Sequence, residues 1–331
     1  MKIYIAYTGG TIGMVPSDNG LVPDAAFAKQ LADQLGQYKE LEHECVIESY
    51  ETLIDSSNAA PKDWAMIGRD IENKWQDFDA FIVLHGTDTM AYTAAALNYM
   101  IAPSKKPIIV TGAQVPLYKA RSDAMNNVLG AVSACEHLVA KKRQGVFLFF
   151  ADRLIEGDRA HKSHTSDWRA FRSVNSPAYG ELGIDWEWRD SHFSQLLIKP
   201  PMKFRIPDME EGTVTMLPVF PGVQAEHWQG LLNEKVKGAV LLSYGAGNAP
   251  DKNAALLGVL KAASERGVVI VNVSQCGAGS VVAGAYAAGS ALTNAGVVSG
   301  KDSTYEAAFA RLHVLIGLGM DSREIKDIFN R

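Results

Sequence analysis

Strand-like and helix-like segments alternate along most of this 331-residue chain, and this alternation restricts its fold more than any other feature. Short apolar runs rich in β-branched and aromatic residues are typical of buried strands. In the first half of the chain such runs lie at 3–7, 45–50, 81–84, 108–111 and 146–150. Segments with the spacing of amphipathic helices lie between them, at 25–36, 61–74, 90–100 and 124–141. The alternation predicts an α/β fold with a mainly parallel sheet flanked by helices on both faces.

The alternation stops between residues 191 and 212, where prolines and mixed charges replace any regular period. It resumes on a smaller scale, with strand-like runs at 213–220, 239–243 and 268–273 and helical segments at 225–233, 253–266, 305–318 and 322–330. A chain of this length is too long for one ordinary domain. We therefore expect an N-terminal domain at 1–190, a linker at 191–212 and a smaller C-terminal α/β domain at 213–331.

The composition argues against two classes of function. The formal net charge is -5, so no basic field is available to attract nucleic acid. No apolar run reaches the roughly eighteen residues of a membrane helix, and the chain enters a strand without a signal-peptide pattern. We therefore expect a soluble, cytoplasmic protein with no nucleic-acid or membrane partner. The cysteines Cys45, Cys135 and Cys276 form no CxxC pair, which predicts buried, reduced thiols.

Polar side chains gather where the predicted strands of the first domain end. Each of the first five strands is followed by such a group: Thr8 to Thr11, Asp55 to Asn58, His85 to Thr89, Thr111 to Gln114, and Asp152 to Lys162. The carboxyl ends of parallel strands meet at one edge of a sheet. We therefore expect one crevice that holds several hydroxyl groups, a carboxylate and a lysine.

These residue types suit covalent catalysis by a threonine. A hydroxyl is a weak nucleophile, so it needs a base and donors that stabilise a developing oxyanion. The glycines around Thr11 can turn backbone amides toward a ligand, and Thr87, Asp88 and Lys162 can form a threonine, carboxylate and lysine relay. The lysine acts as a base only where its pKa is lowered, by burial or by a second cation.

Each motif also has a simpler interpretation. The glycine-rich TGGTIG is equally typical of a phosphate-binding turn or a plain tight turn, and Thr87 or Asp88 can simply cap the helix that starts at Met90. His161, His164 and Asp167 lack a further spaced ligand for a metal. The run at 277–280 lacks the complete glycine pattern and the acidic residue of a dinucleotide site.

The motifs together resemble those of a known family. TGGTIG near the N-terminus and HGTDTMAYTA after the third strand resemble the paired signatures of the L-asparaginases, in the same order and at a similar separation. Further segments resemble the bacterial, cytoplasmic type I branch: AYTGGTIGM, DSSNAAPKDW, KPIIVTGAQVPL, RSDAMNN and SYGAGNAP. The resemblance covers nearly the whole chain. It implies hydrolysis of L-asparagine to L-aspartate and ammonia, with no metal and no organic cofactor.

The resemblance also implies roles for the relay residues. Thr11 matches the primary nucleophile of the family, which attacks the side-chain amide carbon to give a β-acyl ester that water then cleaves. Thr87 matches the threonine near the scissile amide and the attacking water. Lys162 matches the lysine that tunes this threonine. Asp88 matches a carboxylate that also binds the α-amino group of the substrate.

Substrate contacts are implied in the same way. Ser56 and Ser57 match positions that hold the α-carboxylate and α-amino ends of the substrate, and Ala113 matches a position whose backbone carbonyl faces the leaving amide. Asn248 in SYGAGNAP resembles a residue that reaches into the site of a neighbouring subunit. A homodimer is then the smallest working unit, and a homotetramer, a dimer of dimers, its usual doubling.

One position departs from the family pattern. The family carries a tyrosine in a mobile lid after the first motif, where this chain has Leu21. Either another group activates Thr11, or turnover is slow, or the lid alignment is shifted. A catalytically silent protein that binds asparagine or aspartate is therefore an alternative. Another is the asparaginase-like subunit of a tRNA-dependent amidotransferase, although that subunit carries an extra N-terminal domain. The sequence does not decide whether asparagine or glutamine is the preferred substrate. It also does not decide whether a second, regulatory asparagine site is present.

Overall fold

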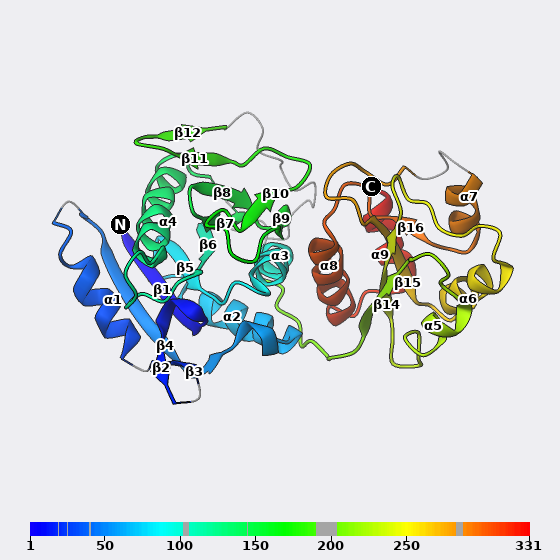
Figure 1. Ribbon diagram of the computed structural model, residues 1–331, viewed down its shortest axis with the longest axis horizontal. Coiled ribbons are helices and arrows are strands. Elements are labelled where there is room, and N and C mark those ends of the chain that lie inside the picture. Colours follow the sequence, from blue (N-terminus) through cyan, green and yellow to red (C-terminus); the bar gives the residue numbers. More distant parts are fainter. Residues whose placement is uncertain are drawn as a thin grey trace. The chain divides into compact units, whose positions relative to one another are not determined.

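The computed structural model describes residues 1–18, 20–24, 26–39, 41–101, 106–143, 145–189, 204–282 and 287–331. They form two compact units, Met1–Ile206 and Pro207–Arg331 (Figure 1). Most of the predicted linker, at 191–203, lies outside the described residues. The linker at 191–212 and the domain limits 1–190 and 213–331 therefore stay predictions.

The described strands of the first unit include an eight-stranded sheet in the order β12-β11-β8-β7-β6-β5-β1-β4. Its parallel strands are β1 (Lys2–Gly9), β4 (Glu44–Ile54), β5 (Ala80–Leu84), β6 (Pro107–Thr111) and β7 (Gly145–Phe150). Antiparallel strands extend one side, namely β8 (Arg153–Glu156), β11 (Gly180–Leu182) and β12 (Trp186–Trp188). The predicted parallel sheet is confirmed. The antiparallel extension was not predicted, because strands this short leave no readable alternation.

The register of the parallel strands brings their carboxyl ends together. Tyr7 of β1 pairs with Leu84 of β5, and Leu84 pairs with Thr111 of β6. The segments that leave these strands therefore start at the same edge of the sheet. This is the edge at which the sequence places most of its polar residues.

Helices cover both faces of this sheet, as Figure 1 shows: α1 (Phe27–Leu35), α2 (Pro61–Lys74), α3 (Met90–Ile101) and α4 (Ala124–Ala140). Side chains alternate between the two faces of a strand. Ile3 and Ile5 of β1 share a buried core with residues of α1 and α4. Tyr4 points to the other face, where its hydroxyl donates to Asp70 of α2 at 2.9 Å. The helices bury β1, β5, β6 and β7, as their continuous apolar runs predicted. The edge strand β4 has no fully buried residue.

The second unit contains a smaller parallel sheet in the order β13-β14-β15-β16. Its strands are β13 (Val214–Pro218), β14 (Gly238–Ser243), β15 (Val269–Ser274) and β16 (Val298–Ser299). The helices are α5 (Ala225–Gln229), α6 (Ala254–Glu265), α7 (Ala287–Asn294), α8 (Tyr305–Gly317) and α9 (Ser322–Asn330). One core packs under α5 and α6 and the other under α8 and α9. The predicted smaller α/β fold is confirmed, whereas β16 and α7 were not predicted.

Two antiparallel hairpins stand apart from the sheets. The first consists of β2 (Met14–Ser17) and β3 (Gly20–Pro23), and directly follows the single turn of 3-10 helix at Thr11–Gly13. The second consists of β9 (Ala160–Lys162) and β10 (Phe171–Ser173). Both carry or flank residues that the sequence singled out, so they bear on the site.

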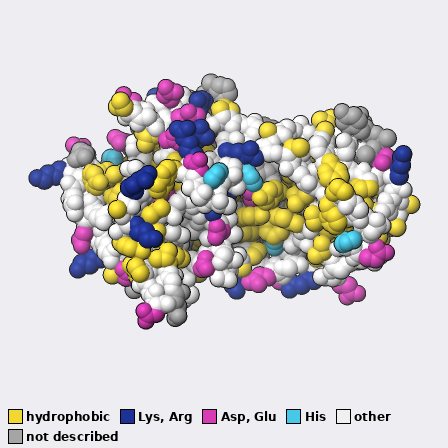
Figure 2. Space-filling view, in the orientation of Figure 1, with side chains coloured by type: hydrophobic (Ala, Val, Ile, Leu, Met, Phe, Trp, Pro, Cys, Tyr) yellow, Lys and Arg dark blue, Asp and Glu magenta, His cyan; other side chains and the backbone are white. Residues whose placement is uncertain are grey.

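The first unit has a surface of mixed charge on the face shown in Figure 2, and the three thiols are free. On the face shown in Figure 2, acidic and basic side chains are interspersed over the first unit. None of the described helices is both long and apolar enough to cross a bilayer. All three cysteines are free, and Cys135 is buried as predicted. Cys45 is only partly buried, and Cys276, which follows the end of β15, is exposed, so the prediction of a buried thiol is wrong at Cys276 and met only in part at Cys45.

Candidate active site

Glycines let the segments at the strand ends touch. A Cβ atom on Gly10 would lie 2.4 Å from the backbone nitrogen of Gly86, and one on Gly112 would lie 2.2 Å from the carbonyl oxygen of His85. A Cβ atom on Gly86 would lie 2.3 Å from the hydroxyl oxygen of Ser56. Only glycine permits such approaches. The segments after β1, β4, β5 and β6 therefore meet, as the convergence of polar residues predicted.

Buried His85 holds the segment that leaves β5. Its backbone nitrogen donates to the carbonyl of Thr111 at 2.8 Å. On the ring, Nδ1 lies 2.7 Å from the carbonyl oxygen of Gly86, and Nε2 lies 3.0 Å from the hydroxyl of Thr93. Burial lowers the pKa of His85. The neutral ring therefore donates from Nδ1 and accepts at Nε2, which fixes the backbone next to Thr87.

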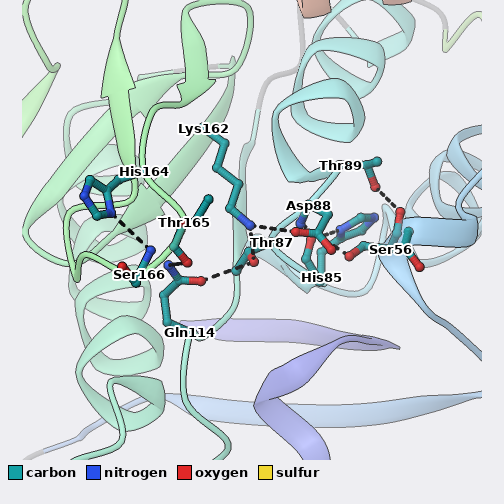
Figure 3. A network of polar contacts seen from close by, with 12 residues as sticks. Ser56, His85, Thr87, Asp88, Thr89, Gln114, Lys162, His164, Thr165 and Ser166 are labelled. Carbon is teal, nitrogen blue, oxygen red and sulfur yellow. Dashed lines mark hydrogen bonds and ion pairs between the residues drawn. The ribbon is translucent and has the colours of Figure 1, made fainter.

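Thr87, Asp88 and Lys162 lie in contact (Figure 3). The Nζ atom of Lys162, at the end of β9, donates to the hydroxyl oxygen of Thr87 at 2.9 Å and to Oδ1 of Asp88 at 2.7 Å. The Lys162 side chain is 19% exposed, whereas that of Asp88 is 61% exposed. The ammonium group is thus largely shielded, while the carboxylate still faces solvent and can accept from a ligand.

Thr11 lies on the turn that adjoins this group. It begins the 3-10 turn after Gly10, and its carbonyl accepts from the amide of Met14. Because Gly10 and Gly86 touch, the threonines that follow them, Thr11 and Thr87, lie on adjacent segments. Thr11 is only partly buried, and its hydroxyl forms no hydrogen bond with the residues that the structure describes. Its oxygen is therefore available to a ligand.

Ser56 and Ser57 follow β4 and differ in exposure. Ser56 is buried, and its hydroxyl oxygen accepts from the amide of Asp88 at 3.4 Å. Its carbonyl accepts from the hydroxyl of Thr89 at 2.8 Å. Ser57 is exposed, and its amide donates to the side chain of Asp55 at 3.1 Å. The pair therefore borders the Thr87 and Asp88 segment, with Ser56 beneath it and Ser57 on the surface.

The segment after β6 is held by the start of α4. Oδ2 of Asp123 accepts from the amide of Gln114 at 2.9 Å, and Oδ1 accepts from that of Val115 at 2.9 Å. The side-chain amide of Asn127 donates to the carbonyl of Gly112 at 2.8 Å. These contacts explain the RSDAMNN segment as a support for the loop. Ala113 lies in that loop and is buried.

Gln114 is a site residue to which the sequence analysis assigned no role. Its Oε1 accepts from the hydroxyl of Thr87 at 3.4 Å. Its Nε2 donates to the carbonyl oxygens of Thr165 and Asp167, at 3.2 and 3.3 Å. Its place among the polar residues that follow the strands was the signal that could have identified it.

Asn248 belongs to the second unit. Two backbone hydrogen bonds between Tyr244 and Asn248, of 2.9 and 2.8 Å, close a short loop after β14. Gly245 and Gly247 in this loop both have positive φ. The Asn248 side chain is partly buried. Its role in the site of a neighbouring subunit stays a prediction.

His164, which follows Lys162, supports a turn. Nδ1 of His164 accepts from the amides of Ser166 and Asp167 at 3.1 and 2.8 Å (Figure 3). Within the described ranges, no group of three or more His, Cys, Asp or Glu side chains is arranged to hold a metal ion. The position of His164 is therefore explained by the turn itself.

Leu21 lies on β3 in the hairpin that follows Thr11. It pairs with Pro16 of β2 and is 42% exposed. The base of the hairpin is closed by a hydrogen bond of 3.0 Å from the amide of Asp24 to the carbonyl of Gly13. A hairpin thus occupies the position where the sequence analysis expected a lid, and its Leu21 offers no hydroxyl group.

Comparisons with known proteins agree with this geometry. Residues 2–193 match the family model described as asparaginase, N-terminal, and residues 213–329 match the glutaminase/asparaginase C-terminal domain. L-asparaginase 1 of Escherichia coli K12 is 41% identical over 330 residues, which cover 98% of this chain and 94% of that protein.

Solved structures and a further relative extend the comparison. The crystal structure of L-asparaginase I from Vibrio cholerae is 42% identical, with a TM-score of 0.87, and the match covers 100% of this chain and 97% of the other. An L-asparaginase of Thermococcus kodakarensis is 31% identical over 335 residues, which cover 100% of this chain and 97% of that protein. With matching family models along both units and this full-length similarity, the chain belongs to the asparaginase family.

Proposed function

We propose that the protein hydrolyses the side-chain amide of L-asparagine to L-aspartate and ammonia. The observation that carries this proposal is the contact of Lys162 with both Thr87 and Asp88, on the segment next to the Thr11 turn. Family membership supplies the reaction class, and the relatives described as L-asparaginases support the substrate.

Thr11 is the proposed nucleophile. Its hydroxyl oxygen attacks the side-chain amide carbon, and the carbonyl oxygen of the substrate becomes an oxyanion. Collapse of the tetrahedral intermediate breaks the C–N bond, and the proton lost by the Thr11 hydroxyl ends on the leaving nitrogen, so that ammonia departs. The product of this half-reaction is a β-aspartyl ester of Thr11. Backbone amides of the glycine-rich turn are the groups that can stabilise the oxyanion.

Thr87 and Lys162 are proposed to act on the water that cleaves this ester. The ammonium group of Lys162 lies 2.9 Å from the Thr87 oxygen. A positive charge at this distance stabilises negative charge on that oxygen as a proton is transferred. Hydrolysis regenerates the Thr11 hydroxyl and releases aspartate. No step of this route requires a metal or an organic cofactor.

The zwitterionic end of the substrate determines the remaining roles. The exposed carboxylate of Asp88 is proposed to accept from the α-amino group. Ser56 and Ser57 are proposed to hold the α-carboxylate and α-amino ends, and the backbone carbonyl of Ala113 to accept from the leaving amide. A small substrate held at both ends places its amide carbon near the nucleophile.

Assembly and location are part of the proposal. We infer a homodimer, or a homotetramer formed from two dimers, in which Asn248 contributes to the site of a neighbouring subunit. L-asparagine and L-aspartate are then the small-molecule partners. We also infer a cytoplasmic location, because segments such as DSSNAAPKDW and SYGAGNAP resemble the cytoplasmic type I branch. Light scattering of the wild-type protein and of Asn248→Ala tests the assembly.

Ammonia release from asparagine by the purified protein is the primary test. We expect Thr11→Ala and Thr87→Ala each to lower kcat by about 10^3-fold or more while the circular dichroism spectrum is unchanged. Thr293→Ala is the matched control, because the Thr293 hydroxyl only donates to the carbonyl of Gly289 within α7. Undiminished activity in both site variants would contradict the mechanism.

Leu21 favours one second function, the binding of asparagine or aspartate without turnover. Leu21 lies on the hairpin next to Thr11, and its side chain carries no hydroxyl group. Calorimetric binding of either amino acid without ammonia production would support this alternative. Steady-state rates with asparagine and glutamine side by side then define the substrate, since a pocket discriminates a single methylene by only about 1–3 kcal/mol.

A further inference from the structure

The Gln114 side chain has a single allowed orientation. Its Nε2 lies 3.2 and 3.3 Å from the carbonyl oxygens of Thr165 and Asp167, which accept hydrogen bonds but cannot donate them. A flipped amide would place its oxygen against these two oxygens. The amide group therefore directs Nε2 toward the carbonyls and Oε1 toward Thr87 (Figure 3).

The hydrogen bonds of Thr87 then follow from donor and acceptor chemistry. The ammonium group of Lys162 only donates, so the Thr87 oxygen accepts from it at 2.9 Å. The hydroxyl hydrogen of Thr87 must point elsewhere. Among the described residues, Oε1 of Gln114 at 3.4 Å is the acceptor available to it. The second lone pair of the Thr87 oxygen is left for a ligand or a water molecule.

Gln114 is well placed to impose this direction. The backbone amide of Gln114 donates to Oδ2 of Asp123 at 2.9 Å, so the side chain extends from a fixed backbone. The carbonyls that it binds belong to the turn that follows Lys162. That turn is closed by His164, whose Nδ1 accepts from the amide of Asp167 at 2.8 Å. One side chain therefore connects Thr87 with the segment that carries Lys162.

We propose that Gln114 is a positioning residue for the proposed amide hydrolysis. Its Oε1 fixes the direction of the Thr87 hydroxyl hydrogen, and its Nε2 holds the turn at 163–167 beside Lys162. The inference rests on the proposed function, because it assigns Gln114 to the relay that acts on the substrate. We expect the 3.4 Å separation to shorten when a ligand binds, because catalytic hydrogen bonds are often long in unliganded sites.

Three variants separate this role from a purely structural one. Gln114→Met has a similar size and loses the side-chain hydrogen bonds to Thr87, Thr165 and Asp167. Gln114→Glu keeps the acceptor for Thr87 and loses the donors to Thr165 and Asp167. Gln275→Met is the matched control: Nε2 of Gln275 donates to two backbone carbonyls, of Val219 and Leu242, at 2.6 Å each. The control tests what the loss of such a backbone tie does by itself.

We expect Gln114→Met to lower kcat about tenfold with KM changed less than threefold. Gln114→Glu should retain more of kcat than Gln114→Met. Gln275→Met should change kcat less than twofold at a similar loss of melting temperature. If kcat falls in proportion to the melting temperature in all three variants, Gln114 is structural and the inference is wrong.

Hydrogen exchange gives a readout that does not depend on turnover. The amides of Ser166 and Asp167, which donate to His164, should exchange faster in both Gln114 variants than in the wild-type protein. Unchanged exchange in both variants would overturn the inference, whatever their activity. An inactive wild-type protein would contradict the proposed function alone, because the exchange measurement still decides whether Gln114 holds this turn.

Discussion

The parallel strands of the two main sheets end in loops that are built in different ways. At the edge of the first sheet, backbone packs against backbone: a Cβ atom on Gly10 would lie 2.4 Å from the nitrogen of Gly86. After the second sheet, Gly245 has no atom within 4 Å of such a Cβ position. There, side chains connect the loops, as in the 2.6 Å hydrogen bond from the hydroxyl of Ser274 to the carbonyl of Gly245.

The difference explains why chemistry is concentrated at one edge. Where glycine backbones touch, the Thr11 hydroxyl is not needed to hold its loop in place, and its oxygen stays available. Where side chains hold the loops together, Ser274 and Gln275 are already occupied by backbone carbonyls. A sheet edge that is to act on a ligand therefore benefits from close backbone packing, which here leaves the hydroxyl of Thr11 unengaged.

The largest effect is expected from an alanine substitution in the packed glycines. Gly10→Ala forces a Cβ atom into the backbone of Gly86 at a residue with φ of 90°, so we expect a loss of more than about 3 kcal/mol in the free energy of unfolding. Gly245→Ala has open space and φ of 49°, and should cost about 1 kcal/mol for the left-handed backbone alone. Urea unfolding of both variants measures the difference. Equal losses would show that the two edges are packed alike.

The next prediction concerns the loss of stability in acid, because each unit buries a neutral histidine. Burial lowers the pKa of His85 in the first unit and lowers that of His313 in the second to about 4. Below pH 6.5, the ordinary pKa of histidine, the unfolded chain gains a proton on the His313 imidazole and the folded chain does not. Stability must therefore fall as the pH decreases from 6.5, until the folded His313 also becomes protonated near pH 4.

For His313 this loss amounts to roughly 3 kcal/mol at pH 4. We expect His313→Gln to be less stable than the wild-type protein at pH 7 but to lose less stability between pH 7 and pH 4. Urea unfolding at several pH values measures this, with an exposed histidine variant, His227→Gln, as control. Parallel pH profiles for the wild-type protein and His313→Gln would contradict the assignment.

The sequence predicted those parts of this contrast that depend on continuous local patterns. The buried run at 3–7 became the centre of β1, because a parallel strand covered on both faces is apolar at every position. The polar residues after the strands converged because parallel topology brings those ends together. The relay of Thr87, Asp88 and Lys162 was proposed from residue types at the strand ends and then from the family motifs, and the structure places the three in contact.

What the sequence did not predict depends on contacts between distant segments. The role of Gln114 requires the carbonyls of Thr165 and Asp167, which lie 51 and 53 positions further along the chain. Backbone carbonyls leave no mark in a sequence, so no motif could have indicated this contact. The hairpin of β2 and β3 was likewise not predicted, because strands of four residues are too short for an alternation to be read.

The smallest effect is expected where the two edges are alike. The hydroxyl groups of Tyr7, at the end of β1, and of Tyr244, just after β14, are both buried with no hydrogen-bond partner among the described residues. Tyr7→Phe and Tyr244→Phe should therefore change the free energy of unfolding by less than about 0.5 kcal/mol, or raise it, because no bond is lost and an unpaired polar atom leaves the interior.

Tyr4→Phe is the control on the same strand as Tyr7. Its hydroxyl donates to Asp70 at 2.9 Å, so its loss should cost about 2 kcal/mol. A loss above about 1 kcal/mol in Tyr7→Phe or Tyr244→Phe would mean that the hydroxyl has a partner in solution, and the two edges would then differ in this respect as well.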